Sequence, residues 1–317
     1  MAPKKRAKRA SPKRKPSARQ KPAPKASATQ EASQVSLLHA LRDSIDRDIT
    51  ERISTHKRVV ARIRKQIAEG APRPLMLLAH GDSWFNYPLT GNTLPIGDTD
   101  IIAHLRTMGT PPPRILNISH FGDATTDELG LPKQKRLIAA LHPDNWLDGK
   151  PDAILFSGGG NDIAGDQFCI WLNYEDSGKP GLDPIRFPAR LASIQASYED
   201  LLLFRDRYAP HVKIFGHDYD FPHPMEPHPP CTGPWMKPSL GFTGWNDAEG
   251  TKILHDALDQ FRAMLLKLTS SEFIVVPTQT TLAYEDWANE LHPYPDGFKK
   301  LAQVFIAKVR EHFPGRI

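Results

Sequence analysis

Five short apolar segments alternate with longer helical patterns, and this feature most constrains the fold of the chain. The apolar segments span 75–79, 115–118, 153–156, 212–215 and 273–276. Each has little polar alternation, which is typical of strands buried on both faces of a parallel sheet. Apolar residues recur at helical spacing over 191–201, 253–268 and 297–312. The alternation predicts an α/β fold, a three-layer α/β/α sandwich with a five-stranded parallel sheet and right-handed crossovers.

Residues 1–30 differ in composition from the rest of the chain. They contain eleven Lys or Arg, no Asp or Glu, and no large apolar residue beyond Met1. Such a segment cannot bury enough surface to offset its chain entropy, so we expect a disordered tail. Its charge would attract a polyanion, either nucleic acid or an anionic membrane, unless it is a solubilising extension. The remaining residues carry thirty Lys or Arg against thirty-six Asp or Glu, so the globular part is acidic.

A helical arm is predicted over 31–70, between the tail and the α/β region at 71–317. No Pro or Gly occurs over 31–69, and eight Leu, Ile or Val residues recur at steps of three, four or seven. This pattern predicts one or two amphipathic helices that end at Gly70 and Pro72. The apolar face either packs against the α/β region or mediates self-association through a coiled-coil seam.

The sequence contains no segment typical of membrane insertion or secretion. No stretch approaches the roughly 20 apolar residues of a membrane span, and the basic N-terminus is not followed by the apolar stretch of a secretory signal. We therefore expect a cytoplasmic protein, although export routes that need no leader would leave the same pattern.

Glycine-containing motifs follow the first three apolar segments. They are Gly81-Asp82-Ser83, then Gly122-Asp123, then 159–162, which reads Gly-Gly-Asn-Asp. Because the carboxyl ends of parallel strands meet at one edge of a sheet, the three motifs should lie together. Ser83 could be a nucleophile if a base lies near it, and His292 in Leu291-His292-Pro293 could be that base.

The same motifs contain candidate donors for an oxyanion hole. Gly122 allows its backbone N–H to approach a ligand closely, and the Asn161 side-chain amide can donate a hydrogen bond. Two or three donors aimed at one point stabilise a tetrahedral intermediate, each by about 3 kcal/mol. Together with a nucleophile and a base, these donors are the groups that a serine hydrolase requires.

Over residues 75–312 the chain resembles the SGNH hydrolase superfamily, also called GDSL-type esterases and lipases. The blocks match in order at Gly81-Asp82-Ser83, Gly122, 159–162 and His292. The resemblance implies a flavodoxin-like sandwich in which Ser83 is the nucleophile and His292 the general base. It also implies an oxyanion hole formed by the Ser83 and Gly122 amides with the Asn161 side chain. The expected activity is cleavage of carboxylic esters through an acyl-enzyme on Ser83, by an esterase, lipase or O-acetyl esterase.

The last block departs from the family pattern. The family usually has Asp three residues before the histidine, where this chain has Asn289. An amide cannot offer a carboxylate to the imidazolium, although its carbonyl oxygen can accept a hydrogen bond and fix the tautomer. We favour a Ser-His dyad supported by Asn289 or a backbone carbonyl. Asp286 is the best alternative carboxylate, and Glu290 is another.

Two long segments, 165–187 and 217–245, follow strands at the edge where ligands of α/β proteins bind. Their aromatic residues either shape a substrate site or pack the loops; they are Phe168, Trp171, Phe221, Trp235, Phe242 and Trp245. The acidic residues Asp82, Asp123 and Asp162 are interpreted as turn and cap residues.

No cofactor or metal is expected. A proline-rich loop contains His223, Glu226, His228 and Cys231, but their spacing does not match a defined zinc pattern. The α/β-hydrolase fold is set aside because no serine has glycine at both −2 and +2.

A second function class remains open. In it, the protein is a nucleic-acid-associated or scaffold protein tethered by the basic tail, with a non-catalytic hydrolase-like body. If the protein is instead an ester hydrolase, its expected partner is its substrate, a small-molecule, glycan or lipid ester. DNA binding that is lost on deletion of residues 1–30, in a protein without esterase activity, would favour the second class.

Overall fold

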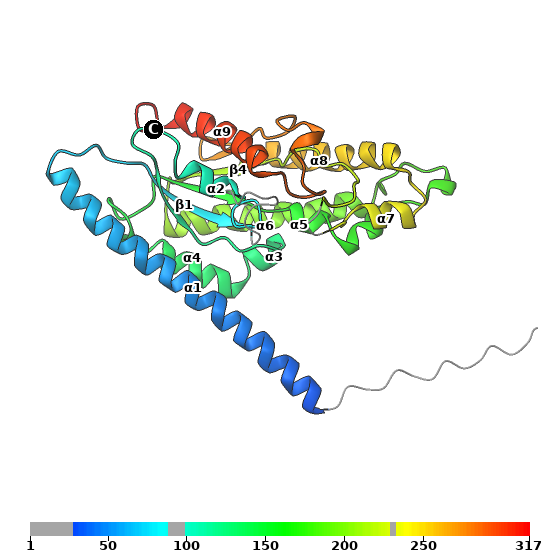
Figure 1. Cartoon of the computed structure of the whole chain (residues 1–317), viewed down its shortest axis with the longest axis horizontal. Helices are drawn as coiled ribbons and strands as arrows, with labels where there is room; N and C mark the ends of the chain where they lie inside the picture. The colour runs from blue at the N-terminus through cyan, green and yellow to red at the C-terminus, as the bar shows by residue number, and fades with distance from the viewer. Residues whose placement is uncertain (1–27, 88–98, 229–232) are drawn as a thin grey trace, which may run out of the picture. The chain divides into compact units, whose positions relative to one another are not determined.

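A computed structural model describes residues 28–87, 99–228 and 233–317, with side chains from residue 43 onward. Most of the predicted tail therefore lies outside the described residues. The helices and strands, in chain order, are α1 (Ala28–Ala68), β1 (Met76–Gly81), α2 (Ile101–Leu105), β2 (Arg114–Asn117), α3 (Thr125–Glu128), α4 (Leu131–Ala140), β3 (Ala153–Ser157), α5 (Gly160–Ile163), α6 (Arg186–Tyr208), β4 (Lys213–His217), α7 (Lys237–Phe242), α8 (Asp247–Leu268), β5 (Phe273–Val276) and α9 (Pro295–His312) (Figure 1).

The five strands form one parallel sheet in the order β2-β1-β3-β4-β5. This confirms the predicted α/β fold class. Every residue of β1 and β3 is buried, as expected for strands covered on both faces. From β1 the chain first adds β2 on one side of β1 and then adds β3 on the other side. The topological switch point therefore lies between β1 and β3.

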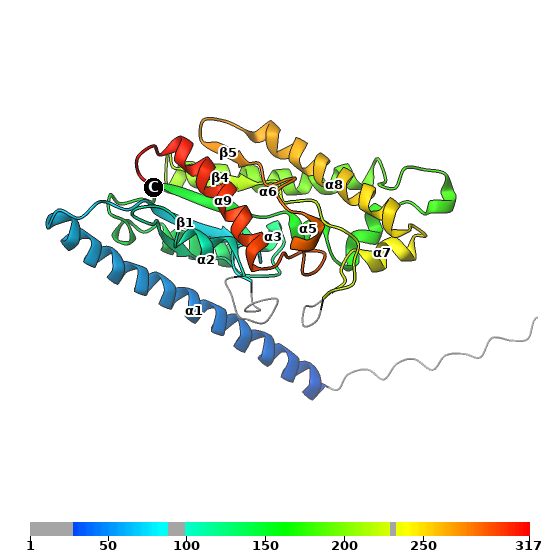
Figure 2. The same ribbon diagram turned by 45° about the horizontal axis from the view of Figure 1, so that its top comes forward.

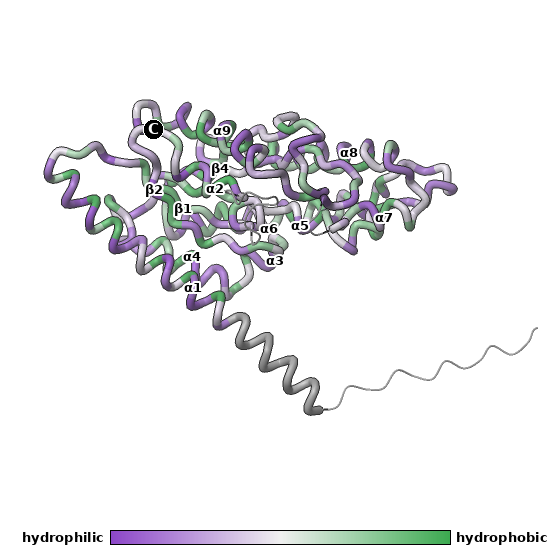
Figure 3. Tube along the Cα trace, viewed as in Figure 1, coloured by the Kyte–Doolittle hydropathy of each residue, from purple (hydrophilic) through white to green (hydrophobic). Residues whose placement is uncertain are grey.

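Helices cover the sheet in two layers. Helix α9 packs beside α2, whereas α6 packs beside both α3 and α8. In Figure 2, α9 lies in front of the strands. The hydropathy colouring of Figure 3 shows mainly apolar residues along the strands. Along α8 and α9 hydrophilic and apolar residues alternate, as amphipathic helices on a sheet require.

The predicted arm corresponds to a single helix, α1. Its residues 48–68 belong to the same compact unit as the sheet, Asp48–Ile317. There Val60 and Ile63 are buried, and Lys57 donates to Asp144 at 2.8 Å. This part of the arm therefore packs on the α/β body, while self-association of the arm stays a prediction. Among the described residues, no helix has both the length and the apolar character needed to cross a membrane.

Gly81, the last residue of β1, cannot carry a side chain. Its φ is +151°, and a Cβ atom there would lie 2.2 Å from the Ser157 carbonyl oxygen, which is backbone and cannot move aside cheaply. We expect Gly81→Ala to lower the free energy of unfolding by about 3 kcal/mol or more, measured by urea denaturation.

Gly70 supplies the matched control for this substitution. Its φ is +93°, but no heavy atom lies within 4 Å of a Cβ placed there. Gly70→Ala should therefore cost only about 1–2 kcal/mol, the penalty of positive φ alone. Equal losses at the two glycines would contradict a collision at Gly81.

Candidate active site

Ser83 lies in a tight turn that begins where β1 ends. The Asp82 N–H donates to the Ser157 carbonyl at 3.0 Å and so continues the pairing of β1 with β3 by one residue. The N–H groups of Phe85 and Asn86 then both donate to the Asp82 carbonyl at 3.1 Å. This turn brings the Ser83 side chain out at the carboxyl edge of the sheet.

His292 approaches Ser83 from a loop near the C-terminus. A short antiparallel bridge closes that loop, and the Trp84 indole N–H donates to the Leu291 carbonyl at 2.9 Å. The latter bond joins the loop directly to the residue after Ser83. His292 Nε2 lies 2.8 Å from Ser83 Oγ, and the two residues are 5% and 7% exposed. The pair thus has hydrogen-bond geometry in a site that is nearly closed to water.

Asn289 fixes the tautomer of His292. The N–H groups of Leu291 and His292 donate to one side-chain atom of Asn289 at 2.9 and 2.8 Å, so this atom must be the carbonyl oxygen. The same oxygen lies 3.2 Å from His292 Nδ1. Nδ1 therefore carries the proton and donates to Asn289, which leaves Nε2 free to accept from Ser83.

The electrostatic setting keeps His292 neutral. Burial disfavours the charged imidazolium and lowers the pKa of His292 to about 3. Because this pKa lies well below neutral pH, the ring is uncharged throughout the physiological pH range.

The two alternative carboxylates are used elsewhere. The Asp286 carboxylate accepts from Lys300 at 2.7 and 2.8 Å and from the Ala283 N–H at 2.8 Å. Glu290 accepts from the N–H groups of Met236 and Lys237 at 2.8 and 2.7 Å, and from that of Trp235. Within the described structure, neither carboxylate hydrogen-bonds to His292. The described structure therefore does not bring the carboxylate of Asp286 or of Glu290 to His292 as its supporting group.

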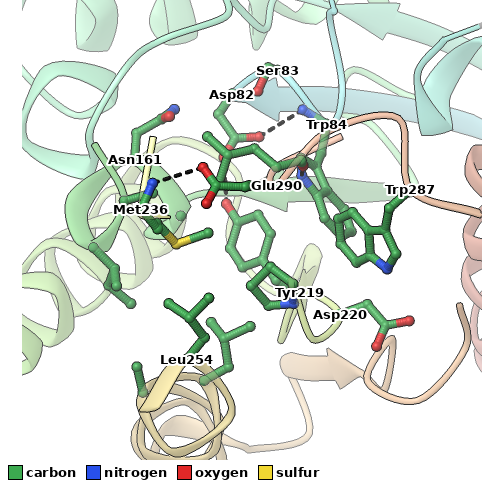
Figure 4. A pocket seen from close by; sticks show the side chains of 17 residues that line it. Asp82, Ser83, Trp84, Asn161, Tyr219, Asp220, Met236, Leu254, Trp287 and Glu290 are labelled. Atoms are coloured by element: carbon green, nitrogen blue, oxygen red, sulfur yellow. Dashed lines mark hydrogen bonds between the residues drawn. The ribbon is translucent and has the colours of Figure 1, made fainter. Parts of the chain in front are cut away.

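Asn161 is positioned by the glycines that precede it. Gly159, the N-terminal cap of α5, has a φ of +107° in the left-handed region that glycine favours. Asn161 Nδ2 donates to the Asp123 carbonyl at 3.0 Å, which uses one of its two amide hydrogens. Asn161 and Ser83 line the same pocket (Figure 4).

Gly122 lies at the margin of this assembly. It has a φ of +79°, and no heavy atom occupies the place of a Cβ. It directly precedes Asp123, whose carbonyl accepts from Asn161, but it is exposed and does not line the pocket. Ser83 contacts His292 directly and shares the pocket with Asn161, whereas Gly122 is linked to Asn161 through its neighbour Asp123.

A second cluster, not predicted from the sequence, contains Ser157, His217, Asp82 and Tyr219. The Tyr219 N–H donates to His217 Nδ1 at 3.3 Å, so His217 Nε2 carries a proton and donates to Ser157 Oγ at 2.8 Å. Ser157 donates in turn to Asp82 Oδ1 at 2.6 Å, and the Tyr219 hydroxyl also donates to Asp82. Burial raises the pKa of Asp82 to about 6 and lowers that of His217 to about 3.

This cluster has the residue types of a catalytic triad in a different order. In a triad, serine donates to histidine and histidine donates to the carboxylate. Here the serine lies between the other two, and its hydroxyl proton already points at Asp82. Ser157 and His217 are also fully buried, and neither lines the pocket. The sequence signal for this cluster was the polar residue that ends each of two strands, Ser157 in β3 and His217 in β4.

The three acidic residues interpreted as turn and cap residues all have hydrogen-bond or ion-pair partners. Asp82 accepts from the Trp84 N–H at 3.0 Å, and Asp123 pairs with Lys133. Asp162 accepts from the Thr125 N–H at 2.7 Å and is buried. These contacts fit the interpretation of loop anchoring.

The pocket beside Ser83 draws on only one of the two long segments. Segment 217–245 contributes Tyr219, Asp220, Pro222 and Met236, whereas 165–187 contributes no lining residue. None of the six aromatic residues named in these segments lines the pocket. The aromatic lining is instead Trp84, Tyr219 and Trp287 (Figure 4).

In its described part, the proline-rich loop with its histidines shows no assembled metal site. His228 Nδ1 lies 2.7 Å from the Tyr294 hydroxyl, and Cys231 is outside the described residues. In the part of the chain that the structure describes, no three His, Cys, Asp or Glu side chains are grouped to hold a metal ion.

Comparison with known proteins gives similarity at the level of structure. No family model matches the chain, and no curated protein matches it. Among solved structures, a lipase from a goat rumen metagenome is 16% identical, with a TM-score of 0.48, over 74% of this chain and 96% of that chain. An acetylxylan esterase from Geobacillus stearothermophilus is 16% identical, with a TM-score of 0.41, over 75% and 95%.

A GDSL-like lipase described from Parabacteroides merdae is 15% identical, with a TM-score of 0.41, over 74% of this chain and 95% of that chain. The chain has the α/β sandwich with a five-stranded parallel sheet that a resemblance to the SGNH hydrolases implies, and its structural neighbours include GDSL-like lipases and acetylxylan esterases.

Proposed function

We propose that the protein is a serine hydrolase that cleaves carboxylic esters through an acyl-enzyme on Ser83. The observation that carries the proposal is the hydrogen-bonded line from Ser83 Oγ to His292 Nε2 and from His292 Nδ1 to Asn289 Oδ1. Nucleophile, base and a group that orients the base are the three parts of an activated serine.

In the first half of the reaction, Ser83 Oγ attacks the ester carbonyl carbon while its proton moves to His292 Nε2. The carbonyl oxygen becomes an oxyanion, which accepts hydrogen bonds from the Asn161 side chain and from the Ser83 and Gly122 N–H groups. The tetrahedral intermediate then collapses. The carbon–oxygen bond to the alcohol breaks, and His292 gives its proton to the departing oxygen.

In the second half, water replaces the alcohol. His292 Nε2 takes a proton from the water, whose oxygen attacks the acyl carbon, and the proton returns to Ser83 Oγ as the acid leaves. Asn289 stabilises the transient imidazolium through its carbonyl dipole rather than through a full negative charge. The relay therefore functions as a dyad supported by an amide.

A panel of p-nitrophenyl esters from acetate to palmitate, together with acetylated xylo-oligosaccharides, tests this proposal. We expect hydrolysis of at least one ester class, with a burst of p-nitrophenol where acylation is faster than deacylation and the acyl-enzyme accumulates. Hydrolysis of none of these esters would refute it.

The pH dependence of kcat/KM should show the effect of an amide, rather than a carboxylate, beside His292. Because the pKa of His292 is lowered to about 3, its basic form persists well below pH 6. We expect kcat/KM to stay nearly flat from about pH 7.5 down to about pH 5. Asn289→Asp puts a negative charge beside the ring, which favours the imidazolium. It should raise the pKa and move the acid limb upward by about 1–3 pH units.

Asp286→Ala is the control for the pH experiment. Its carboxylate is paired with Lys300, so the acid limb should not move. A collapse of turnover in Asp286→Ala with retained activity in Asn289→Ala would overturn the assignment of Asn289 as the supporting group.

A further inference from the structure

We infer that the pocket beside Ser83 binds the acyl chain of the ester, and that it selects apolar acyl groups longer than acetyl. This inference rests on the proposed ester hydrolysis. The pocket is small, with a cavity volume of about 50 Å³, and most of its lining is apolar.

The pocket lies on the acyl side of the reacting carbon. His292 must deliver its proton to the departing oxygen, so the alcohol has to lie on the His292 side of the ester. Ser83 and Asn161 line the pocket, and His292 itself does not, although its loop contributes Trp287, Glu290 and Leu291 to the lining. The substituent that enters it is therefore the one attached to the carbonyl carbon, which is the acyl chain.

Helix α8 supplies an apolar wall at the end of the pocket opposite Ser83 (Figure 4). Leu254, Ala257 and Leu258 are spaced three and four residues apart, so they share one helix face. All three are buried, with exposures of 1%, 1% and 8%. A small residue between two leucines leaves room for methylene groups at this wall.

The carboxylates along the lining already have donors. Glu290 accepts from the N–H groups of residues 235–237, and Asp220 accepts from those of Thr280 and Leu282 at 2.7 and 2.6 Å. Asp82 accepts from Ser157, Trp84 and Tyr219. With these groups engaged, the pocket offers apolar contact rather than hydrogen bonds, which suits a hydrocarbon chain better than a sugar.

Chain-length kinetics on the wild-type enzyme test the inference without any substitution. Each methylene that enters the pocket should raise kcat/KM about fourfold, the effect of burying one CH₂ group. We expect p-nitrophenyl butyrate to be hydrolysed about tenfold faster than acetate or better. An optimum at acetate would overturn the inference while leaving ester hydrolysis intact, whereas hydrolysis of no ester would remove the proposed function itself.

Ala257→Leu tests the location of the chain. The larger side chain should fill the space at the α8 wall, lower kcat/KM for butyrate and longer esters at least tenfold, and change that for acetate less than threefold. Ala263→Leu makes the same substitution on the exposed face of α8 and should leave the whole profile unchanged. Equal loss on all esters in Ala257→Leu, with a thermal midpoint like wild type, would contradict an acyl pocket.

Discussion

Ser83→Ala should lower kcat for the preferred ester by about 10⁴-fold or more, the scale of losing the nucleophile of a serine hydrolase. The substitution removes the Oγ that lies 2.8 Å from His292 Nε2, and no other hydroxyl lies in that position in the described structure. His292→Ala should cause a loss of similar size, because the serine then has no base. The double variant should lose little more than either single variant, since the two groups act as a unit. Steady-state kinetics on purified variants with wild-type thermal midpoints measure these effects.

Ser157→Ala is the matched serine control. Ser157 also bonds a histidine and a carboxylate, but it is buried outside the pocket, and its proton points at Asp82. Its removal should cost about 1–2 kcal/mol of stability and less than tenfold in kcat. If Ser157→Ala abolished turnover while Ser83→Ala retained it, the buried cluster would be the catalytic one.

Asn161→Ala should lower kcat by about 10²–10³-fold with little change in KM, because its amide meets the oxyanion rather than the ground-state ester. The side chain also donates to the Asp123 carbonyl, so the loss of that loop contact has to be separated from the loss of transition-state stabilisation. A KM that rises as much as kcat falls would indicate that Asn161 acts by binding the substrate.

Asn86→Ala controls for the loop contact. Asn86 Nδ2 donates to the Ser119 carbonyl at 3.0 Å, in the same segment after β2 that contains Asp123. It does not line the pocket. We expect a similar loss of stability in the two variants and less than a tenfold change in kcat for Asn86→Ala. Comparable losses of kcat would contradict a direct role for Asn161.

The strands were predictable because their central residues are apolar and buried. The expected segment 273–276 coincides with β5, whereas β1, β3 and β4 run one or two residues further. The extra residues include His80, Ser157 and His217, which are polar but buried at the carboxyl edge. An apolar run ends before such residues. The sequence pattern therefore predicted strands that are too short and left Ser157 and His217 outside them.

The short helices escaped prediction for a different reason. α2, α3, α5 and α7 have four to six residues, too few for a helical period to emerge. Local and tertiary contacts stabilise them. Asp100, for example, caps α2 by accepting from the Ala103 N–H at 2.7 Å, and Gly159 is the N-terminal cap of α5 with a positive φ.

The sequence limited the candidates for the group that supports His292 but did not decide among them. Spacing put Asn289 three residues before the histidine, with Asp286 and Glu290 nearby. Their separate partners lie far along the chain or in other elements. Glu290 is bound by backbone N–H groups more than fifty residues away, and Asp286 by Lys300 on α9. Only the tertiary fold decides which oxygen faces the imidazole.

Covalent labelling tests the central claim most directly. An alkyl p-nitrophenyl phosphonate reacts with an activated serine by losing p-nitrophenol, and the resulting phosphonyl ester mimics the tetrahedral intermediate. Peptide mapping of the inactivated protein by mass spectrometry should place one adduct on Ser83, and the His292→Ala variant should label at least a hundredfold more slowly. An adduct on Ser157, or undiminished esterase activity after Ser83 is modified, would contradict the account.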